Sequence, residues 1–543
     1  MKKRTLKIGA LILIVTLLFG LCACGKINHS RDTAVLPVMS ASREQIYIVD
    51  RGALNAAEML MLNSLQGIVA QEQAQIYIKD GDNTVFLDEY LMRYPNINVI
   101  ESDNILDVVK AFIESITDSG MVLFEPGDNP TVNMAATVSG AEGWLAVPTE
   151  LKNDVMGLGL SVKKDLTEKK NGRYVNTYET VFEEYKDVLC RDIVIHQSPE
   201  LLTLRDYGIA AGAFCFYTDE SKQSEIRFRN KVFSWMNQNG AVLGWSTTEL
   251  HYVKQASKNG LFILASDHCI NLSMLSAIGD GEAAVQKNQY KTIIADPTKH
   301  YVALVMSDGD NVQWFTTTVP FRGHFADRVS TKGDYKLSWT APPLLQTLAP
   351  SVLQYVYDTA TDKDRFIAGV SGMGYINPAS YPEKYLPGFV AGSADAMQKS
   401  DMPFLAILDN TTSMSKLGKA MQFFADLDEI SGGVMQIGNK YEELGGKVVW
   451  CGDKPFISAE MSFWYSAKND EDTINEQYIR DFAETVNELP IDITSEDGYT
   501  YINIHPWSTS IEDVNQLVSL FDEHIEVVYT EELAQLVRKN VKH

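Results

Sequence analysis

The sequence predicts an α/β protein in which N-terminal parallel-sheet domains are followed by a C-terminal (β/α)8-like domain of the TIM-barrel type. The 543 residues are 45% hydrophobic and 22% charged, which is typical of a globular chain. Short apolar runs bounded by Asp, Gly or Pro alternate with segments of helical periodicity. Eight such runs follow Tyr301, over the length of one barrel domain. A doubly wound sheet would give the same alternation and is the alternative.

Residues 1–23 are expected to be a signal peptide, because four basic residues precede the apolar run 8–21. Residues 21–24 (LCAC) resemble a bacterial lipobox, so Cys24 is the expected lipidation site and residues 24–40 form a tether. A transmembrane anchor is the alternative, but the run is shorter than the roughly 20 residues that span a bilayer. We therefore expect a secreted protein that a lipid on Cys24 anchors to the bacterial cell membrane or outer membrane.

The net charge is -24, and it becomes -28 without the first 23 residues, because these carry four of the 47 basic residues and none of the 71 acidic ones. A nucleic-acid-binding function is excluded, since it requires a basic surface that displaces counterions from phosphates. A polyanionic polymer is also disfavoured, and a neutral extracellular glycan fits better. The cysteines form no CxxC pair or short-spaced Cys/His cluster, so neither a structural zinc site nor a disulfide framework is expected.

Two α/β regions are expected before the barrel, at residues 41–150 and 151–290. The Lys- and Glu-rich stretch 151–190 reads as a helical connection, and the non-periodic stretch 285–298 as the next boundary. A helix is expected from Ala56 to Val69. The expected strands are 44–50, 74–80, 96–102, 120–126, 143–148, 191–196, 207–217, 240–245 and 260–266.

The third region, 298–543, is the expected barrel domain. In a barrel of this type the chemistry lies at the carboxyl ends of the strands. Asp308, Asp409, Glu460 and His505 are candidates on this rule, because each ends or directly follows a strand. The expected strands are 301–307, 335–340, 365–371, 403–409, 433–438, 455–460, 499–505 and 525–530.

The segment SDGDNVQW follows the first of these strands and contains Asp308, Asp310, Asn311 and Trp314. Two carboxylates and an amide on one loop suit a hard cation, or sugar hydroxyls beside a stacking indole. An ordinary Asp/Gly turn is the alternative.

The segment SGMGYINP follows the third strand of this region. Gly372 and Gly374 allow positive φ or close approach of a ligand to the backbone, and they place Tyr375 on a loop. The segment is no dinucleotide-binding fingerprint, because that pattern needs a third glycine at the start of a helix.

These motifs carry a resemblance to a known family. The chain resembles the bacterial family named for its GxGYxYP motif, whose members are described as glycoside hydrolases. The segments that carry the resemblance are GMGYINP, SDGDNVQW and the HPW of residues 505–507. Other segments that are similar to the family are LQG at 65–67, RDYG at 205–208, LGW at 243–245 and SWTAPPLLQTLAP from Ser338. The sequence departs from the name motif at Asn377, where the family has Tyr. The resemblance implies N-terminal α/β domains before a barrel-like domain with glycosidase activity.

Glycoside hydrolysis needs two carboxyl groups, one with a raised pKa. Glu460 is the expected acid, because the apolar segment PFISAEMSFW around it would raise its pKa. Asp308, Asp310 and Asp409 are candidates for base, nucleophile or substrate anchor; Asp409 could instead cap the following helix. The expected substrate-binding residues are Asn311, Trp314, Gly372, Gly374, Tyr375, His505 and Trp507.

Two other functions use the same residues. Asp308, Asp310 and His505 could bind a divalent metal in a polysaccharide deacetylase, although the usual histidine pair is missing. A non-catalytic glycan-binding lipoprotein would need the aromatic residues alone. Glu249 and the pair Asp267–His268 also follow strands. They could reach the mouth of the barrel from a neighbouring domain, but a structural role is favoured for them.

Overall fold

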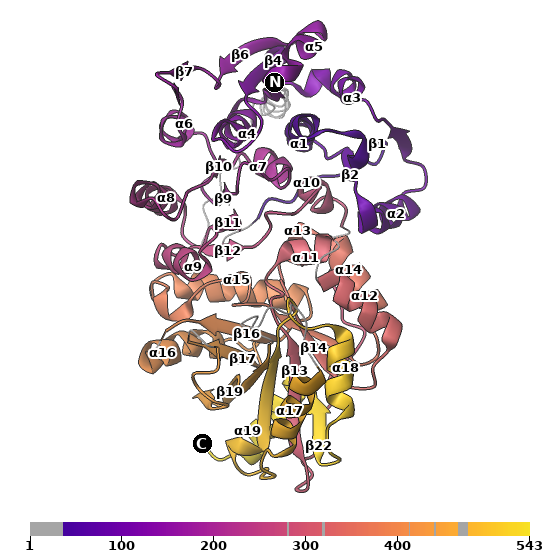
Figure 1. Ribbon diagram of the computed structural model, residues 1–543, viewed down its shortest axis with the longest axis vertical. Helices are drawn as coiled ribbons and strands as arrows, with labels where there is room; N and C mark the ends of the chain where they lie inside the picture. Colours follow the sequence, from indigo (N-terminus) through magenta and orange to yellow (C-terminus); the bar gives the residue numbers. More distant parts are fainter. Residues whose placement is uncertain (1–35, 280–281, 318–320, 412, 439–440, 465–475) are drawn as a thin grey trace, which may run out of the picture. The chain divides into compact units, whose positions relative to one another are not determined.

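The computed structural model describes residues 36–279, 282–317, 321–411, 413–438, 441–464 and 476–543 (Figure 1). Cys24, the expected signal peptide and most of the expected tether lie outside these residues. The fold is mixed α/β with parallel sheets in the N-terminal part, as predicted from the sequence. No helix in the described ranges has both the length and the apolar character needed to cross a membrane.

The described N-terminal residues form three small parallel sheets, whereas the sequence predicted two α/β regions, 41–150 and 151–290. The first has the order β2-β1-β3, the second β5-β4-β6 and the third β10-β9-β11-β12. Their strands are β1 (Gln45–Asp50), β2 (Ile76–Lys79), β3 (Asn98–Glu101), β4 (Gly120–Phe124), β5 (Leu145–Pro148), β6 (Ser161–Asp165), β9 (Ile193–His196), β10 (Phe214–Phe216), β11 (Ala241–Gly244) and β12 (Phe262–Leu264). The helices are α1 (Ala56–Ala70), α2 (Thr84–Arg93), α3 (Ile105–Ala111), α4 (Thr131–Glu142), α5 (Lys152–Gly157), α6 (Tyr178–Tyr185), α7 (Arg205–Ala210), α8 (Gln223–Trp235), α9 (Glu249–Lys258) and α10 (Leu272–Leu275).

Helix α1 is the central packing element of this part. Its first turn is closed by a capping box, in which the Asn55 side chain accepts from the backbone N–H of Glu58 and the Glu58 carboxylate accepts from that of Asn55. A β-carbon on Gly67 would lie 2.6 Å from the Asp206 carbonyl oxygen in α7. The LQG and RDYG segments therefore meet at a helix–helix contact that only glycine allows, and their role is packing.

Two expectations for this part are wrong. The stretch 151–190 is not a helical connection: β6 joins the second sheet, and a hairpin of β7 (Lys169–Lys170) and β8 (Arg173–Tyr174) follows it. Strand β6 is a mostly polar edge strand, so it lacks the apolar run by which strands were predicted. The expected strand 207–217 is divided between α7 and β10, because a short apolar run does not distinguish helix from strand.

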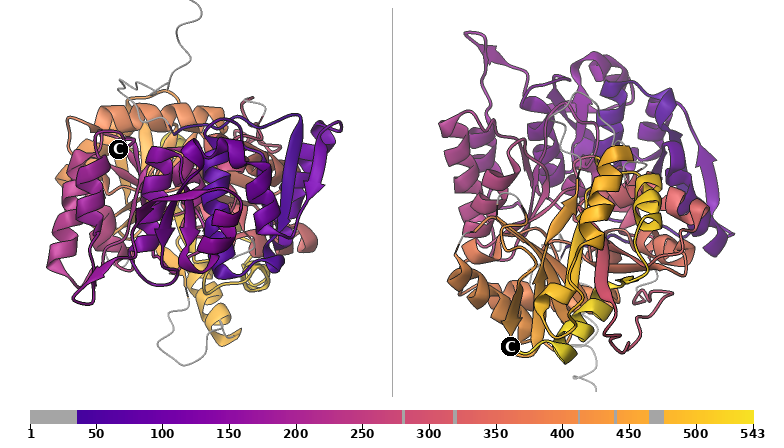
Figure 2. Two further views of the ribbon diagram at one scale, coloured as in Figure 1. Left: turned by 90° about the horizontal axis from the view of Figure 1, so that it is seen from above. Right: turned by 60° about the horizontal axis from the view of Figure 1, so that its bottom comes forward.

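All eight strands predicted after residue 298 are present. They are β13 (His300–Met306), β14 (Leu337–Ala341), β15 (Asp364–Ala368), β16 (Phe404–Asp409), β17 (Gly432–Ile437), β19 (Lys454–Ser458), β21 (Tyr499–Ile504) and β22 (Ile525–Val528), with two short additions, β18 (Val448–Cys451) and β20 (Met461–Phe463). Figure 2 shows the orange and yellow helices on the outside of this curved sheet. The helices are α11 (Val312–Thr316), α12 (Phe321–Thr331), α13 (Leu345–Leu348), α14 (Pro350–Thr359), α15 (Leu386–Lys399), α16 (Met414–Ala425), α17 (Glu476–Asn487), α18 (Ile511–Ser519) and α19 (Thr530–Asn540).

The expected closed (β/α)8 barrel is not observed. In the described part of the chain the strand order is β18-β19-β17-β16-β15-β14-β13-β21-β20, an open path. Strand β22 also pairs with the amino-terminal half of β13, and β14 pairs only with its last two residues. Only Ala459 and Glu460 separate β19, which pairs with β17, from β20, which pairs with β21. The sheet therefore curls, and most of its strands are parallel, so that their carboxyl ends lie at one edge.

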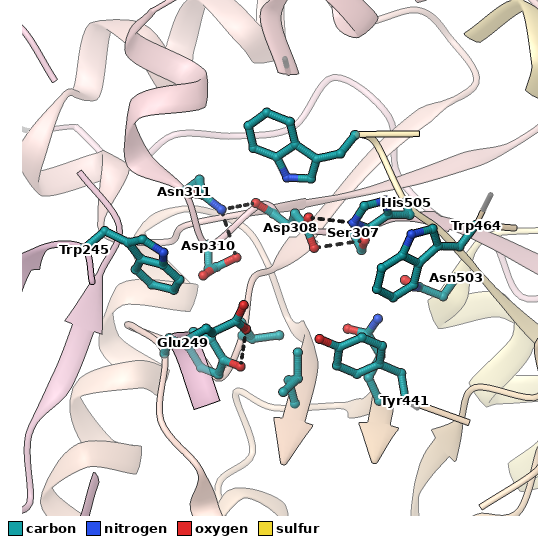
Figure 3. Close-up of a pocket in the computed structure, with 15 residues that line it drawn as sticks. Trp245, Glu249, Ser307, Asp308, Asp310, Asn311, Tyr441, Trp464, Asn503 and His505 are labelled. Carbon is teal, nitrogen blue, oxygen red and sulfur yellow. Dashed lines mark hydrogen bonds and ion pairs between the residues drawn. The ribbon is translucent and has the colours of Figure 1, made fainter. Parts of the chain in front are cut away.

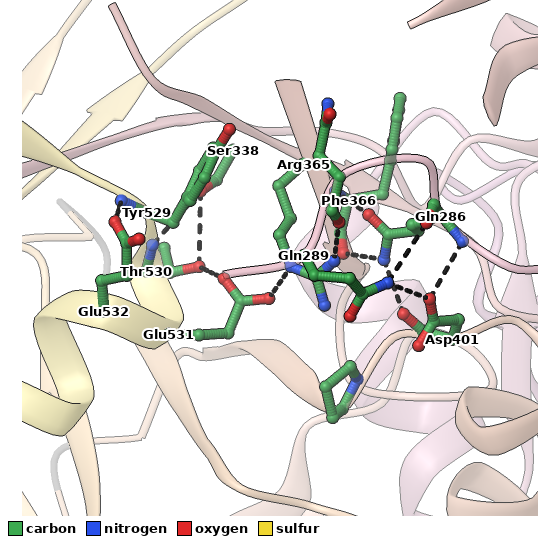
Figure 4. A network of polar contacts seen from close by, with 12 residues as sticks. Gln286, Gln289, Ser338, Arg365, Phe366, Asp401, Tyr529, Thr530, Glu531 and Glu532 are labelled. Carbon is green, nitrogen blue, oxygen red and sulfur yellow. Dashed lines mark hydrogen bonds and ion pairs between the residues drawn. The ribbon is translucent and has the colours of Figure 1, made fainter. Parts of the chain in front are cut away.

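The segment that enters this domain has no helix or strand over residues 282–299, as its lack of periodicity predicts. Side chains hold it in place (Figure 4). The Gln286 amide donates to the Phe366 carbonyl oxygen (2.9 Å) and accepts from the Phe366 N–H (2.8 Å), as a neighbouring strand would. Arg365 donates to the Asn288 carbonyl oxygen (2.5 Å) and pairs with Glu531 (2.5 Å). The boundary segment is thus part of the core of the C-terminal domain.

Candidate active site

A cavity of about 310 Å³ lies at the carboxyl edge of the C-terminal sheet (Figure 3). Residues that end or follow β13, β16, β17 and β21 line it. Trp245 and Glu249, which follow β11 of the third N-terminal sheet, form another part of its wall. The site is therefore built by two domains.

Backbone hydrogen bonds join these two domains beside the cavity. Ile263 of β12 exchanges both of its backbone hydrogen bonds with Tyr375, at 2.9 and 3.0 Å. Two residues along the chain, the Ala265 carbonyl accepts from the Val312 N–H (2.9 Å). Strand β12 thus fixes the positions of Tyr375 and of the loop that contains Asp308.

The loop Asp308–Gly309–Asp310–Asn311 approaches the neighbouring strand very closely. The Gly309 N–H donates to the Thr340 hydroxyl (2.8 Å), and a β-carbon on Gly309 would lie 1.7 Å from the Thr340 carbonyl oxygen. Asp308 has φ +63°, a left-handed conformation that Asp tolerates better than most residues. The Asn311 amide donates to the Asp308 carbonyl oxygen (3.0 Å) and to the Asp310 carboxyl group (3.4 Å). The loop is therefore more than a plain turn, because it presents two carboxyl groups to the cavity.

Three carboxyl groups interact in the cavity. Burial raises the pKa of Glu249, while the Tyr375 hydroxyl, which donates to it at 2.9 Å, acts in the opposite direction. Burial and the negative charge of Glu249 raise the pKa of Asp308 to about 7. Burial and both neighbouring carboxylates raise the pKa of Asp310 further above its ordinary value. Ionisation of one of these carboxyl groups therefore makes ionisation of its neighbours less favourable.

His505 lies on the other side of Asp308, with Nε2 3.7 Å from the carboxylate oxygen and Nδ1 3.1 Å from the Ser508 hydroxyl. Burial lowers the pKa of His505 to about 4, so the ring is neutral at physiological pH. It stacks on Trp464 with ring centres 4.1 Å apart. His505 therefore adds a hydrogen-bonding group to the cavity but no positive charge.

Aromatic rings form the remaining walls. Tyr441 stacks on the far side of Trp464 (5.6 Å). Trp245 stacks with Tyr375 (6.5 Å), and the half-exposed ring of Trp507 stands at the cavity mouth. Faces and edges of aromatic rings are the surfaces on which sugar rings commonly pack. The cavity thus combines stacking surfaces with carboxyl groups.

Comparison with known sequences places the chain in a family. Four family models match it in succession: the GxGYxYP first domain at residues 45–114, the second at 119–189, the third at 191–277, and the "GxGYxYP putative glycoside hydrolase C-terminal domain" at 298–538. The chain belongs to the GxGYxYP family. This confirms the resemblance drawn from the sequence motifs. No curated protein sequence matches the chain significantly.

Two solved structures are similar to this GxGYxYP chain to very different degrees. The crystal structure of a putative hydrolase from Bacteroides thetaiotaomicron has a TM-score of 0.83 at 23% identity, covering 94% of this chain and 98% of that one. It shows a shared fold. A putative polysaccharide deacetylase from Mycobacterium smegmatis has a TM-score of 0.31 at 9% identity, covering 47% of this chain and 96% of that one. This similarity is too low to indicate a shared fold.

The structure brings several of the sequence-predicted residues together. Asp308, Asp310, Asn311, Tyr375, His505 and Trp507 all line the cavity. Glu249 does so as well, although the sequence favoured a structural role for it. The GxGYxYP motif itself contributes Tyr375, which orients Glu249.

Glu460, the expected acid, does not line the cavity. The strand predicted to end there ends at Ser458, and the same extended segment continues as β20 to Phe463, so Trp464 is the residue at the carboxyl edge. The Glu460 carboxylate accepts from the Thr500 hydroxyl (2.8 Å). Thr500 and the cavity residue Asn503 are three positions apart on β21, so their side chains point to opposite faces of the sheet. Glu460 is therefore removed from the candidate catalytic residues.

Asp409 is also outside the cavity. It follows Leu408, which lines the cavity, so alternation along the strand turns the Asp409 side chain to the opposite face. Its two carboxylate oxygens accept from the backbone N–H groups of Ala379 (2.7 Å) and Thr411 (2.8 Å). Asp409 ties two loops together, and it does not cap α16, which begins only at Met414.

Three expected substrate-binding residues have packing roles. Trp314 is 2% exposed and supports Trp507 edge to face, with ring centres 4.9 Å apart. Added β-carbons would strike the Ser393 side chain at Gly372 and the Phe262 ring at Gly374. The buried Asn377, where the family motif has Tyr, does not line the cavity either.

The sequence did not predict the cavity residues Tyr441, Trp464, Gln436 and Asn503, nor Trp245, Ser307, Val370 and Leu408. The two amides Gln436 and Asn503 gave a usable signal, because each is an amide near the end of a mostly apolar strand, in GGVMQI and YTYINI. Tyr441 and Trp464 lie in loops whose position depends on strands that the sequence pattern did not show. Within the described residues, no group of three or more His, Cys, Asp or Glu side chains is arranged to hold a metal ion.

Proposed function

We propose that this protein is a glycoside hydrolase whose reaction takes place at Glu249, Asp308 and Asp310. The observation that carries the proposal is the convergence of three carboxyl groups with raised pKa in one aromatic cavity. Glycosidases require one carboxyl group that keeps its proton near neutral pH and a second that is ionised. The family's description as glycoside hydrolases supports the same reaction class.

The pKa of Asp308 assigns the roles. Asp308 is the proton donor to the leaving-group oxygen, since an acid with a pKa of about 7 both holds and releases a proton under working conditions. Glu249 is the ionised partner, which activates water or attacks the anomeric carbon, and Tyr375 holds it in place. Asp310 lies beside both, and their negative charges raise its pKa. The glycosidic oxygen gains the proton that Asp308 loses, which completes bond cleavage.

A metal-dependent polysaccharide deacetylase and a non-catalytic glycan-binding protein are the alternatives. The deacetylase would use Asp308, Asp310 and His505 as ligands, but these side chains do not form a metal-binding group in the described structure. A purely binding protein would have no need for a proton donor such as Asp308, whose pKa is about 7.

A glycan panel tests the proposal. The protein, Glu249→Gln, Asp308→Asn and Glu460→Gln are incubated with neutral, amino and acidic oligosaccharides, with and without a chelator, and the products are analysed by mass spectrometry. We expect shortened oligosaccharides, insensitivity to the chelator, and loss of products only in the first two variants. Release of acetate that the chelator abolishes would support the deacetylase. Binding without products in any arm would support the binding protein.

The location of the protein is a separate proposal. The apolar run 8–21 and the LCAC segment support export and a lipid on Cys24. Mass spectrometry of the membrane-bound protein should find an acylated N-terminal cysteine, and Cys24→Ala should release the protein from the membrane. An unmodified Cys24 in the mature protein would refute the anchor.

A further inference from the structure

Two buried carboxylates outside the cavity have basic partners. Asp364 pairs with Arg328 at 2.9 Å, and Glu531 pairs with Arg365 at 2.5 Å, all four side chains being almost completely buried. Such pairing is the general rule, because an isolated buried charge is costly.

The cavity departs from this rule. No lysine or arginine is among the residues that the structure describes along its wall, and no ion pair joins one to Glu249, Asp308 or Asp310. The basic side chain nearest to Asp308 in these pairs is His505, at 3.7 Å, and its low pKa keeps it neutral. Among the described residues, no cation therefore compensates the negative charge of the cavity when one of its carboxyl groups is ionised.

Two buried amides also point to a ligand. Gln436 is 6% exposed, and its side chain has no hydrogen-bond partner among the described residues. Asn503 is 1% exposed; its oxygen accepts from the Tyr501 hydroxyl (3.3 Å), while its NH₂ group has no acceptor in the described structure. Both line the cavity, so a bound molecule with hydroxyl groups would satisfy them.

The aromatic walls suit a cation as well as a sugar ring. The faces of Trp, Tyr and Phe rings attract ammonium groups, most strongly when water is excluded. Trp464, Tyr441, Trp245 and Tyr375 surround the carboxyl groups in two stacked pairs. Negative charge, ring faces and free amides together define a ligand that is polar, cyclic and positively charged.

We infer that the cavity binds a sugar unit carrying a protonated amine, a hexosamine without an N-acetyl group. The inference rests on the proposed glycosidase function, which uses Asp308 and Glu249 and leaves the third carboxyl group, Asp310, to receive the ammonium group. N-acetylation removes the positive charge, and a uronic acid would bring a second negative charge into the cavity. The high negative net charge of the whole chain attracts a polycationic glycan in the same way. This refines the neutral substrate expected from net charge, which does not separate neutral from cationic glycans.

The positive charge could instead belong only to the oxocarbenium-like transition state of hydrolysis. Binding of unreacted sugars distinguishes a positive charge on the substrate from one that exists only in the transition state. Affinities of the full chain in detergent are measured by NMR titration at pH 6 for glucosamine, galactosamine and mannosamine, for their N-acetyl forms, for the parent hexoses and for glucuronate. Monosaccharides remove any dependence on linkage.

We expect at least one amino sugar to bind about tenfold or more tightly than both its N-acetyl form and its parent hexose. Binding should weaken with added salt, and calorimetry in two buffers should show release of a proton on binding, since the ammonium group favours ionised carboxyls. Asp310→Asn should abolish the preference, and Glu460→Gln, outside the cavity, should keep it.

Equal affinity for amino sugars and parent hexoses, tighter binding of the N-acetyl forms, or no sugar binding at all would overturn the inference. The wild-type comparison decides this even if Asp310→Asn does not fold. Preference for the amine without hydrolysis of any glycan would refute the proposed function alone. Hydrolysis of neutral glycans with no preference for the amine would refute this inference alone.

Discussion

Replacing Asp308 by Asn should make stability less dependent on pH. In the folded protein the pKa of Asp308 is about 7, against an ordinary value of 3.8. Between these values the folded state holds a proton that the unfolded state has lost, so this group's stabilising contribution is complete below pH 3.8 and is lost as the pH rises through 7. Asn does not titrate, so the variant lacks this loss.

The size of the effect follows from the pKa difference. About three units at about 1.4 kcal/mol each give about 4 kcal/mol as an upper value. The Asp308 side chain is 31% exposed, and solvent screening reduces the expected change to about 2–3 kcal/mol. The free energy of unfolding of Asp308→Asn, relative to the wild type, should therefore rise by about 2–3 kcal/mol between pH 4 and pH 8.

Denaturant unfolding of both proteins at pH 4, 6 and 8, followed by tryptophan fluorescence, measures this difference. The direct effect of exchanging Asp for Asn is common to all three pH values and cancels in the comparison. The activity of the wild-type protein should fall over the same pH range, as Asp308 loses its proton. A relative stability that stays constant with pH, or falls as the pH rises, would refute the assigned pKa of Asp308.

Three further predictions concern the cavity. The rate kcat/KM on a cleaved glycan should fall as the pH rises through about 7, because Asp308 must be protonated; a rate that keeps rising up to pH 9 would exclude it as the acid. Tyr375→Phe removes a hydrogen bond that lowers the pKa of Glu249, so the acidic limb of the pH profile should move to higher pH. The control Tyr381→Phe removes a buried hydroxyl that donates to Asn239 outside the cavity, and it should leave the acidic limb in place. Gly309→Ala should destabilise the protein by about 3 kcal/mol or more in thermal melts, since its β-carbon would overlap the Thr340 carbonyl oxygen; an unchanged melting temperature would contradict the close approach.

The strands of the C-terminal domain could be predicted because they are buried on both faces and therefore read as continuous apolar runs. The carboxyl-edge rule then identified Asp308, Asp310, Tyr375 and His505 correctly as neighbours. Polar or very short strands such as β6 and β20 carry no such run. Because β20 was not predicted, the strand end was placed at Glu460, and Trp464, the residue that the rule would have selected, was not recognised.

Neither the open path of the C-terminal sheet nor the contribution of Glu249 could be read from local patterns. Both depend on contacts between distant segments: β20 with β21, and β12 with the loops that contain Asn311 and Tyr375. Glu249 stands at the start of α9 like many helix-initiating acids. Only the packing of the third domain against the C-terminal domain turns it into a cavity residue with a raised pKa.

The measurement that tests the account most directly compares kcat/KM of Asp308→Asn and Glu460→Gln on whichever glycan the wild-type protein cleaves. Both changes replace a carboxyl group by an amide, one inside the cavity and the other on the opposite face of the sheet. We predict that Asp308→Asn lowers kcat/KM by about 100-fold or more and that Glu460→Gln stays within about twofold of the wild type. Equal activity of the two variants, or a larger loss in Glu460→Gln, would contradict the assignment of catalysis to the cavity.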